Sequence, residues 1–151
     1  MARVKKNTTK DYIQTVGRRR SAIARVRLYP SVRKVQDKEL ELQKGEVSVN
    51  HMLMKDYFRF EAYYPKLNKF LKNMGVEGKF IFTIKVVGGG VNGQLDAMIH
   101  GMARALDKQD SDTYHDILKE GGYLTRDARV RERRKVGTGG KARRKKQSPK
   151  R

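Results

Sequence analysis

The 151-residue sequence contains no cysteine, no tryptophan and only three prolines. The absence of cysteine excludes a disulfide framework, a thiolate zinc site and a cysteine nucleophile. No apolar run approaches the roughly 20 residues of a membrane-spanning helix. The first residues are basic and are followed by polar ones, so they lack the apolar stretch of a secretory signal. We therefore expect a cytoplasmic protein with no membrane partner.

Acidic side chains are scarce: 16 Asp and Glu stand against 36 Lys and Arg, so the formal net charge is +20 at pH 7. Solubility does not require such a charge, which points to a polyanionic partner. Residues 1–27 hold nine bases and one acid, residues 126–151 hold thirteen and two, and residues 28–125 hold fourteen and thirteen. We therefore expect a basic extension over 1–11, a globular body over 12–125 and a basic tail over 126–151.

The tail has too few apolar residues to bury a core, and we expect it to be extended and disordered when free. Like-charged segments of this kind commonly act as arms that become ordered on nucleic acid, although an inert solubilising tail is the alternative. Few aromatic residues accompany its bases, which argues against readout by base stacking. We expect contacts to the backbone and shape of a folded RNA instead.

The periodicity of apolar residues predicts an α+β fold with a small mixed sheet and packed helices. Within an extended segment over 12–29, Ala22 and Val26 alternate with Arg25 and Arg27, so one face is apolar and the other basic; residues 17–20 are interpreted as a bend or bulge. Further elements are expected as strands over 32–42, 47–49 and 79–87, the last one central, and as helices over 50–58 with Asn50 as N-cap, 65–75, from the glycine loop to about 106, and 111–120.

The spacing Gly88-x-Gly90-x-x-Gly93 matches a dinucleotide-binding fingerprint and lies between a predicted strand and a predicted helix. The match fails in context, because no strand with an acid follows about 20 residues later. The segment does not match the nucleotide phosphate-binding loop motif either, because Gln94-Leu95 stands where that motif requires Lys-Ser/Thr. The loop's backbone N–H groups could still attract an RNA phosphate, and a tight turn that requires positive φ is the alternative.

No catalytic or metal site is predicted. His51, His100 and His115 stand apart from one another and from acids at ligand spacing. His100 and Arg104 share a helical face, where structural or RNA-facing roles fit better than catalysis. We expect no enzyme activity, no cofactor and no small-molecule substrate.

Several segments resemble the universal family of ribosomal protein nine of the small subunit, in its bacterial form. Residues 16–26 (Val-Gly-Arg-Arg-Arg-Ser-Ala-Ile-Ala-Arg-Val) resemble its opening motif. Residues 88–94 and 100–106 are similar to its glycine-loop helix, although the family usually has Gly where Asp96 stands and often Arg where Ile99 stands. Its tail is matched by residues 124–129, 132–137 and 141–144 and by the final Lys150-Arg151.

The resemblance implies a ribosomal-S5-domain-2-like fold, a place in the small-subunit head beside other head proteins, and binding to rRNA. It also implies that the tail reaches the anticodon stem-loop of the peptidyl-site tRNA through Lys150 and Arg151. With the basic patterns above, the residues expected to bind rRNA are Arg18, Arg19, Arg20, Arg25, Arg27, Gly89, Gly90, Gln94, His100, Arg104, Arg126, Arg129, Arg133, Arg134, Lys135, Lys141, Arg143 and Arg144. The alternative is a free protein, such as an RNA chaperone, that binds nucleic acid without preference.

Overall fold

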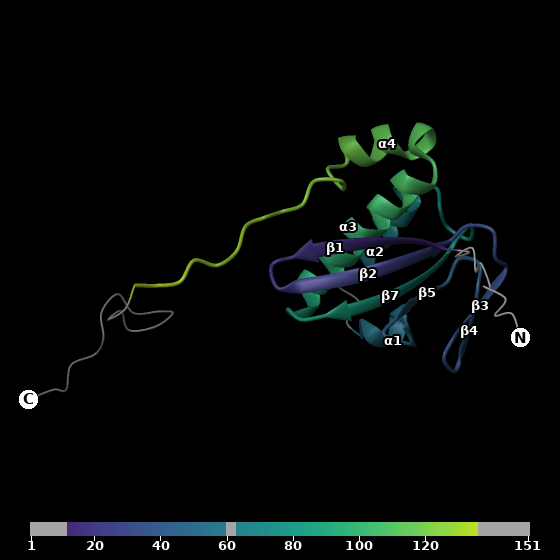
Figure 1. Ribbon diagram of the computed structural model, residues 1–151, viewed down its shortest axis with the longest axis horizontal. Helices are drawn as coiled ribbons and strands as arrows, with labels where there is room; N and C mark the ends of the chain where they lie inside the picture. Colours follow the sequence, from purple (N-terminus) through teal and green to yellow (C-terminus); the bar gives the residue numbers. More distant parts are fainter. Residues whose placement is uncertain (1–11, 60–62, 136–151) are drawn as a thin grey trace, which may run out of the picture.

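The computed structural model describes residues 12–59 and 63–135, and it shows a five-stranded mixed sheet with helices against one face (Figure 1). The strands are β1 (Ile13–Arg19), β2 (Ala22–Tyr29), β3 (Lys34–Asp37), β4 (Leu40–Gln43), β5 (Val47–Val49), β6 (Met52–Leu53) and β7 (Ile81–Val87). The helices are α1 (Met54–Tyr57), α2 (Tyr64–Asn73), α3 (Val91–Gln109) and α4 (Ser111–Glu120).

The sheet order is β1-β2-β7-β5-β6, in which β5 and β7 are parallel and the other neighbours antiparallel. Two further strands, β3 and β4, form a separate hairpin. The predicted α+β fold with a small mixed sheet is confirmed.

Two expected single strands are hairpins. The segment over 12–29 divides into antiparallel β1 and β2, joined by a tight turn at Arg20, whose φ is 51°. The segment over 32–42 divides into β3 and β4 around Lys38, with a φ of 57°. The interpretation of residues 17–20 as a bend or bulge was wrong. A two-residue turn leaves the alternation of both flanking strands intact, so periodicity alone does not distinguish such a turn from a bend within one strand.

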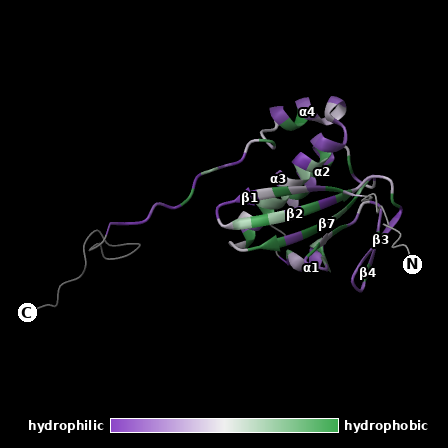
Figure 2. Ribbon diagram, viewed as in Figure 1, coloured by the Kyte–Doolittle hydropathy of each residue, from purple (hydrophilic) through white to green (hydrophobic). Residues whose placement is uncertain are grey.

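The alternation within β2 is confirmed. Ala22, Ala24, Val26 and Leu28 are fully buried beneath α3, whereas the residues between them face the other way. Figure 2 shows this alternation as hydrophobic and hydrophilic colours along the strand. The strand β7 is central, as predicted, with β2 on one side and β5 on the other.

Small residues bring α3 against β1. A Cβ atom built on Gly17 would lie 1.9 Å from the carbonyl oxygen of Ala97 and 2.5 Å from the nitrogen of Gly101. The Thr15 hydroxyl next to this contact donates a 2.7 Å hydrogen bond to the Gly101 carbonyl. The small residues Ala97 and Gly101 of α3 therefore leave room for a close neighbour, which is the backbone of β1.

Helices α2 and α4 lie where the sequence predicts them. Pro65 occupies the first turn of α2, and Gly75 follows its C-terminus with a φ of 57°. The side chain of Asp110 caps α4 by accepting a hydrogen bond from the nitrogen of Thr113. Leu118 of α4 is fully buried in the core, whereas Ile117 is 44% exposed.

The prediction that Asn50 caps a helix is wrong. Asn50 and His51 have positive φ and form the turn between β5 and β6. The Asn50 side chain accepts a 2.8 Å hydrogen bond from the nitrogen of Val86 and donates a 3.1 Å bond to the Val86 carbonyl. It thereby extends the ladder between β5 and β7 by one pair, and α1 begins after Leu53 without a side-chain cap.

We expect Asn50→Gly to lower the free energy of unfolding by about 1–3 kcal/mol, since the variant keeps the positive φ and leaves a buried backbone pair at Val86 without partners. Urea denaturation followed by circular dichroism measures this change. An unaltered midpoint would show that the two hydrogen bonds contribute nothing net.

Candidate nucleic-acid interface

Four exposed basic side chains lie on the sheet face that no helix of the described chain covers (Figure 1). They are Arg18 on β1, Arg25 and Arg27 on β2, and Lys85 on β7. We call this set the open face. Arg25 lies directly opposite Lys85 in the β2–β7 register, and Arg18 lies opposite the neighbouring Ile23. The predicted basic face of residues 25 and 27 therefore extends over three strands.

The pairing of Arg25 with Lys85 is unfavourable for folding. Directly opposed like charges destabilise an antiparallel pair by a few tenths to about 1 kcal/mol. The arginine guanidinium also suits an anion that accepts two parallel hydrogen bonds, as phosphate does. An arrangement that opposes folding and concentrates positive charge on an uncovered surface is typical of an anion-binding site.

The neighbouring Arg27 is held in place by aromatic rings. Its guanidinium carbon lies 5.0 Å from the ring centroid of Tyr12, which itself packs against Tyr29 at 5.5 Å. A cation–π contact restricts the side chain but leaves N–H donors at the edge of the guanidinium. Arg27 is thus partly ordered before any partner binds.

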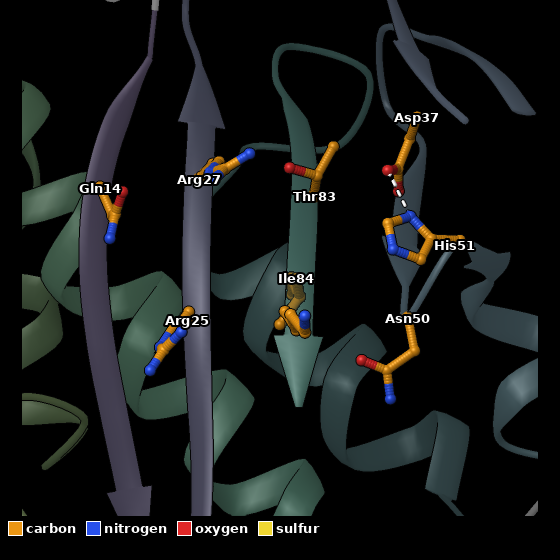
Figure 3. Close-up of a pocket in the computed structure, with 9 residues that line it drawn as sticks. Gln14, Arg25, Arg27, Asp37, Asn50, His51, Thr83 and Ile84 are labelled. Carbon is orange, nitrogen blue, oxygen red and sulfur yellow. Dashed lines mark hydrogen bonds and ion pairs between the residues drawn. The ribbon is translucent and has the colours of Figure 1, made fainter. Parts of the chain in front are cut away.

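The open face borders a shallow hollow whose far wall comes from the β5–β6 turn and the β3–β4 hairpin (Figure 3). There the His51 ring nitrogen Nδ1 lies 2.6 Å from Asp37, and the other oxygen of Asp37 accepts a 2.6 Å bond from Ser48. Asp37, the acid among the residues that line the hollow, is therefore already paired. The hollow presents Arg25, Arg27 and Lys85 to an incoming group.

The glycine loop packs against the tip of the β1–β2 hairpin. Gly88 and Gly89 have φ of 74° and 68°, and Cβ atoms there would lie 2.6 Å from the Ser21 carbonyl oxygen and 2.8 Å from the Ala22 Cβ. The tight-turn interpretation is thus confirmed at two positions. Gly90 is the N-cap residue of α3, and no atom lies within 4 Å of a Cβ built on it. The backbone N–H groups at the start of α3 therefore remain accessible to an anion.

Gln94 stabilises the loop from within. Its Oε1 accepts a 2.9 Å bond from the Tyr57 hydroxyl, and its Nε2 donates a 3.1 Å bond to the Gly88 carbonyl. These bonds connect α1, α3 and the glycine loop. Any effect of Gln94 on RNA would act through the loop's shape.

The three consecutive arginines of the opening motif do not form one cluster. Arg18 belongs to the open face, and Arg20 lies exposed in the hairpin turn. Arg19 points to the helical side, where its side chain is only 13% exposed and contacts the carboxylates of Asp96 and Asp127. Strand alternation separates Arg18 from Arg19, because successive side chains of a strand point to opposite faces of the sheet.

His100 and Arg104 lie where α3 meets β1. Burial and, after it, the Arg104 charge lower the pKa of His100, and its Nδ1 atom is buried without a hydrogen-bond partner. The Arg104 guanidinium donates a 2.7 Å bond to the Val16 carbonyl at the exposed edge of β1. Arg104 therefore helps to hold α3 against β1, and the side chain as a whole remains exposed.

The start of the tail has neither helix nor strand and leads away from the body (Figure 1). Arg126 and Arg129 are near the body, and Arg133, Arg134 and Lys135 are exposed beyond them. The remaining predicted contacts lie outside the described residues: Lys141, Arg143, Arg144, Lys150 and Arg151.

Two negative findings concern the described ranges 12–59 and 63–135. They contain no group of three His, Asp or Glu side chains that could hold a metal ion. None of their helices has the length and apolar character needed to cross a membrane.

The family model described as ribosomal protein S9/S16 matches residues 17–151. The chain belongs to this family. The small ribosomal subunit protein uS9c of Mesostigma viride is 40% identical over 128 residues, which cover 84% of this chain and 83% of that protein. The uS9 proteins of Cutibacterium acnes and Bifidobacterium animalis are 38% and 41% identical over 121 residues, and the matches cover 80% of this chain and 63% and 67% of those proteins. The chain therefore spans less than two thirds of the Cutibacterium protein's length.

Membership in the S9/S16 family confirms the resemblance seen in the motifs. It identifies a ribosomal protein of the small subunit that takes part in translation and binds RNA, as predicted, and not an enzyme. The glycine fingerprint thus belongs to a ribosomal fold and not to a dinucleotide site.

Sequence reasoning missed two members of this surface, Gln14 and Lys85. Gln14 lies opposite Arg27 in the β1–β2 register and lines the same hollow. Lys85 is the charged member of the outward series in β7, which is otherwise Ile81, Thr83 and Val87. The lone charge in that series was the available signal, and only the strand order reveals that it lies beside Arg25.

Proposed function

We propose that this small-subunit protein binds rRNA with two surfaces, the open face and the basic tail. Two neighbouring segments supplement the first surface: the β1–β2 turn with Arg20, and the glycine loop with Gly89 and Gly90. The open face belongs to the folded body and the tail leads away from it, so the two surfaces suit a protein that contacts separate RNA segments. The rRNA contacts proposed for the tail are Arg126, Arg129, Arg133, Arg134, Lys135, Lys141, Arg143 and Arg144.

The observation that carries this proposal is the pairing of Arg25 with Lys85, two cations for which the described residues supply no ion pair, on a sheet face that no described helix covers. A phosphate supplies the negative charge that this pair lacks. The gain in binding free energy increases when several phosphates are neutralised together, because more counterions are released. Arg19, Gln94, His100 and Arg104 contribute differently. Their polar atoms engage or face neighbouring protein segments, so they position the RNA-binding surfaces.

We further propose that Lys150 and Arg151 at the end of the tail contact the anticodon stem-loop of the peptidyl-site tRNA. The family resemblance of the tail supports this role, and so does its charge of thirteen bases against two acids. A segment of this composition gains order by neutralising phosphates rather than by burying apolar surface.

The cytoplasm is the compartment that we propose, because the bacterial relatives are similar over 80% of the chain. Sedimentation of a tagged copy in cell extract tests the ribosomal assignment. Cofractionation with small subunits at low and moderate salt is the expected result. Release into the light fractions at moderate salt would favour a free nucleic-acid-binding protein, and recovery in an organelle would contradict the compartment.

Deleting Lys150 and Arg151 is expected to weaken the retention of tRNA in the peptidyl site while leaving subunit assembly largely intact. The two cations at the tip are far along the chain from the body that docks on rRNA, so the two functions separate. Filter binding of labelled tRNA to purified subunits measures retention, and a Lys145→Gln and Lys146→Gln variant removes equal charge as a control. Failure of the truncated protein to enter subunits would refute this division of labour.

A further inference from the structure

Arg19 connects the body to the root of the tail. Its Nη2 atom lies 2.8 Å from a carboxylate oxygen of Asp127, and its Nε atom lies 3.5 Å from Asp96 of α3. Its Nη1 atom donates to the backbone carbonyls of Asp127 and Arg129, at 3.5 and 3.0 Å. One guanidinium therefore holds both the side chain and the backbone of the segment that leaves the body.

The held segment is itself folded back into a small loop. The Arg129 guanidinium contacts the same Asp127 carboxylate, with a 2.7 Å bond from Nη2 and a 3.0 Å bond from Nε. The backbone nitrogen of Arg129 adds a third bond of 3.0 Å to Asp127. These contacts to Arg129, and then the charge of Arg19, hold the pKa of Asp127 well below its usual range. Asp127 therefore stays ionised at physiological pH.

Further contacts fix the residues that precede this segment. Tyr123 packs its ring edge-on against Phe70 of α2 at 5.0 Å, and Leu124 packs partly buried against the core. Lys66 of α2 pairs with Asp96 and completes a chain of charges across α2, α3, β1 and the tail. Two acids in this chain lie among three bases, so each carboxylate is shared between cations.

We propose that Arg19, Asp96 and Asp127 form a clasp that sets the point and direction at which the tail leaves the body. They are positioning residues, and the inference rests on the proposed function of the tail in reaching tRNA. A flexible chain searches a large volume, and fixing its first residues reduces the conformational entropy lost when its tip binds. Direct phosphate binding by Arg19 would compete with this role, since its N–H groups already face two carboxylates and two carbonyls.

The absence of cysteine allows two spin labels to be placed without removing native residues. The substitutions Lys108→Cys on α3 and Val130→Cys just beyond the clasp, where Val130 is 66% exposed, provide the two attachment sites. Spin labels there report the distance between body and tail in the full chain. Pulsed electron–electron double resonance is expected to give one narrow peak in the distance distribution of the doubly labelled parent. Asp127→Asn should replace this peak with a broad distribution, and Asp116→Asn on α4, which changes the net charge equally, should preserve it.

A double-substitution cycle tests whether the two groups act through one contact. Arg19→Gln alone and Asp127→Asn alone should each broaden the distribution, and the double variant should broaden it no further. Circular dichroism checks that each variant is folded. A narrow peak that survives Asp127→Asn would overturn the clasp, as would a parent chain that already shows a broad distribution.

Retention of peptidyl-site tRNA on purified subunits separates this inference from the function on which it rests. Weaker retention in both Asp127→Asn and the Lys150–Arg151 deletion supports the positioning role. If the deletion weakens retention but Asp127→Asn does not, the positioning role is refuted and the tail function stands. If the deletion has no effect, the proposed tRNA contact itself fails, whatever the distance measurement shows.

Discussion

Gly17→Ala is expected to lower the free energy of unfolding by about 3 kcal/mol or more, a large part of the roughly 5–15 kcal/mol by which a typical domain is stable. The added methyl group would overlap the Ala97 carbonyl oxygen, 1.9 Å away, and the Gly101 nitrogen, 2.5 Å away. Both atoms belong to the α3 backbone, so no side-chain rotation relieves the clash. Relief requires α3 to move off β1, which would also break the Thr15–Gly101 hydrogen bond. Chemical denaturation of the full chain measures the loss.

Gly90→Ala is the matched control for this prediction. No atom lies within 4 Å of a Cβ built there, and its φ of −99° suits any residue. Its free energy of unfolding should stay within about 0.5 kcal/mol of the parent. Equal stability of Gly17→Ala and Gly90→Ala would show that the close approach of α3 to β1 is not required.

The prediction of the fold succeeded where burial follows a regular period. The alternation in β2, the helix stripe of α3 and the bounds of α4 all arise from one face that contacts a core, which the sequence encodes locally. It failed at Arg20, Lys38 and Asn50, where non-glycine residues adopt positive φ. Their partners lie across the sheet, as Val86 does for Asn50, and no local pattern reports such a contact.

The candidate site was predictable in its charge and only partly in its geometry. The outward positions of Arg25 and Arg27 follow from alternation within one strand. Lys85 joins the open face only because β7 pairs with β2, which the sequence does not reveal. Arg19 is drawn to the helical side of the sheet by Asp96 and Asp127, which lie 77 and 108 positions away along the chain. Asp96 also pairs with Lys66 of α2, a contact that likewise depends on the packing of distant elements.

Removing two cations from the open face, by Arg25→Gln with Lys85→Gln, is expected to weaken rRNA binding strongly without harming the fold. Each lost phosphate contact should reduce the slope of log affinity against log salt by about 0.9, so the pair should reduce it by about 1.8. Thermal stability should stay the same or rise, because the opposed charges no longer repel each other across β2 and β7. Salt titrations with a small-subunit head rRNA fragment and thermal melts measure both quantities.

The variant Lys69→Gln with Lys72→Gln lowers the net charge by the same amount on the exposed side of α2 and is the control. A site on the open face requires the first pair to matter far more than the second, because a bound phosphate interacts mainly with charges within about one Debye length, about 10 Å at 0.1 M salt. Equal losses in both variants would mean that total charge alone governs binding. That outcome would refute the open face as a docking site, even for a protein that cofractionates with small subunits.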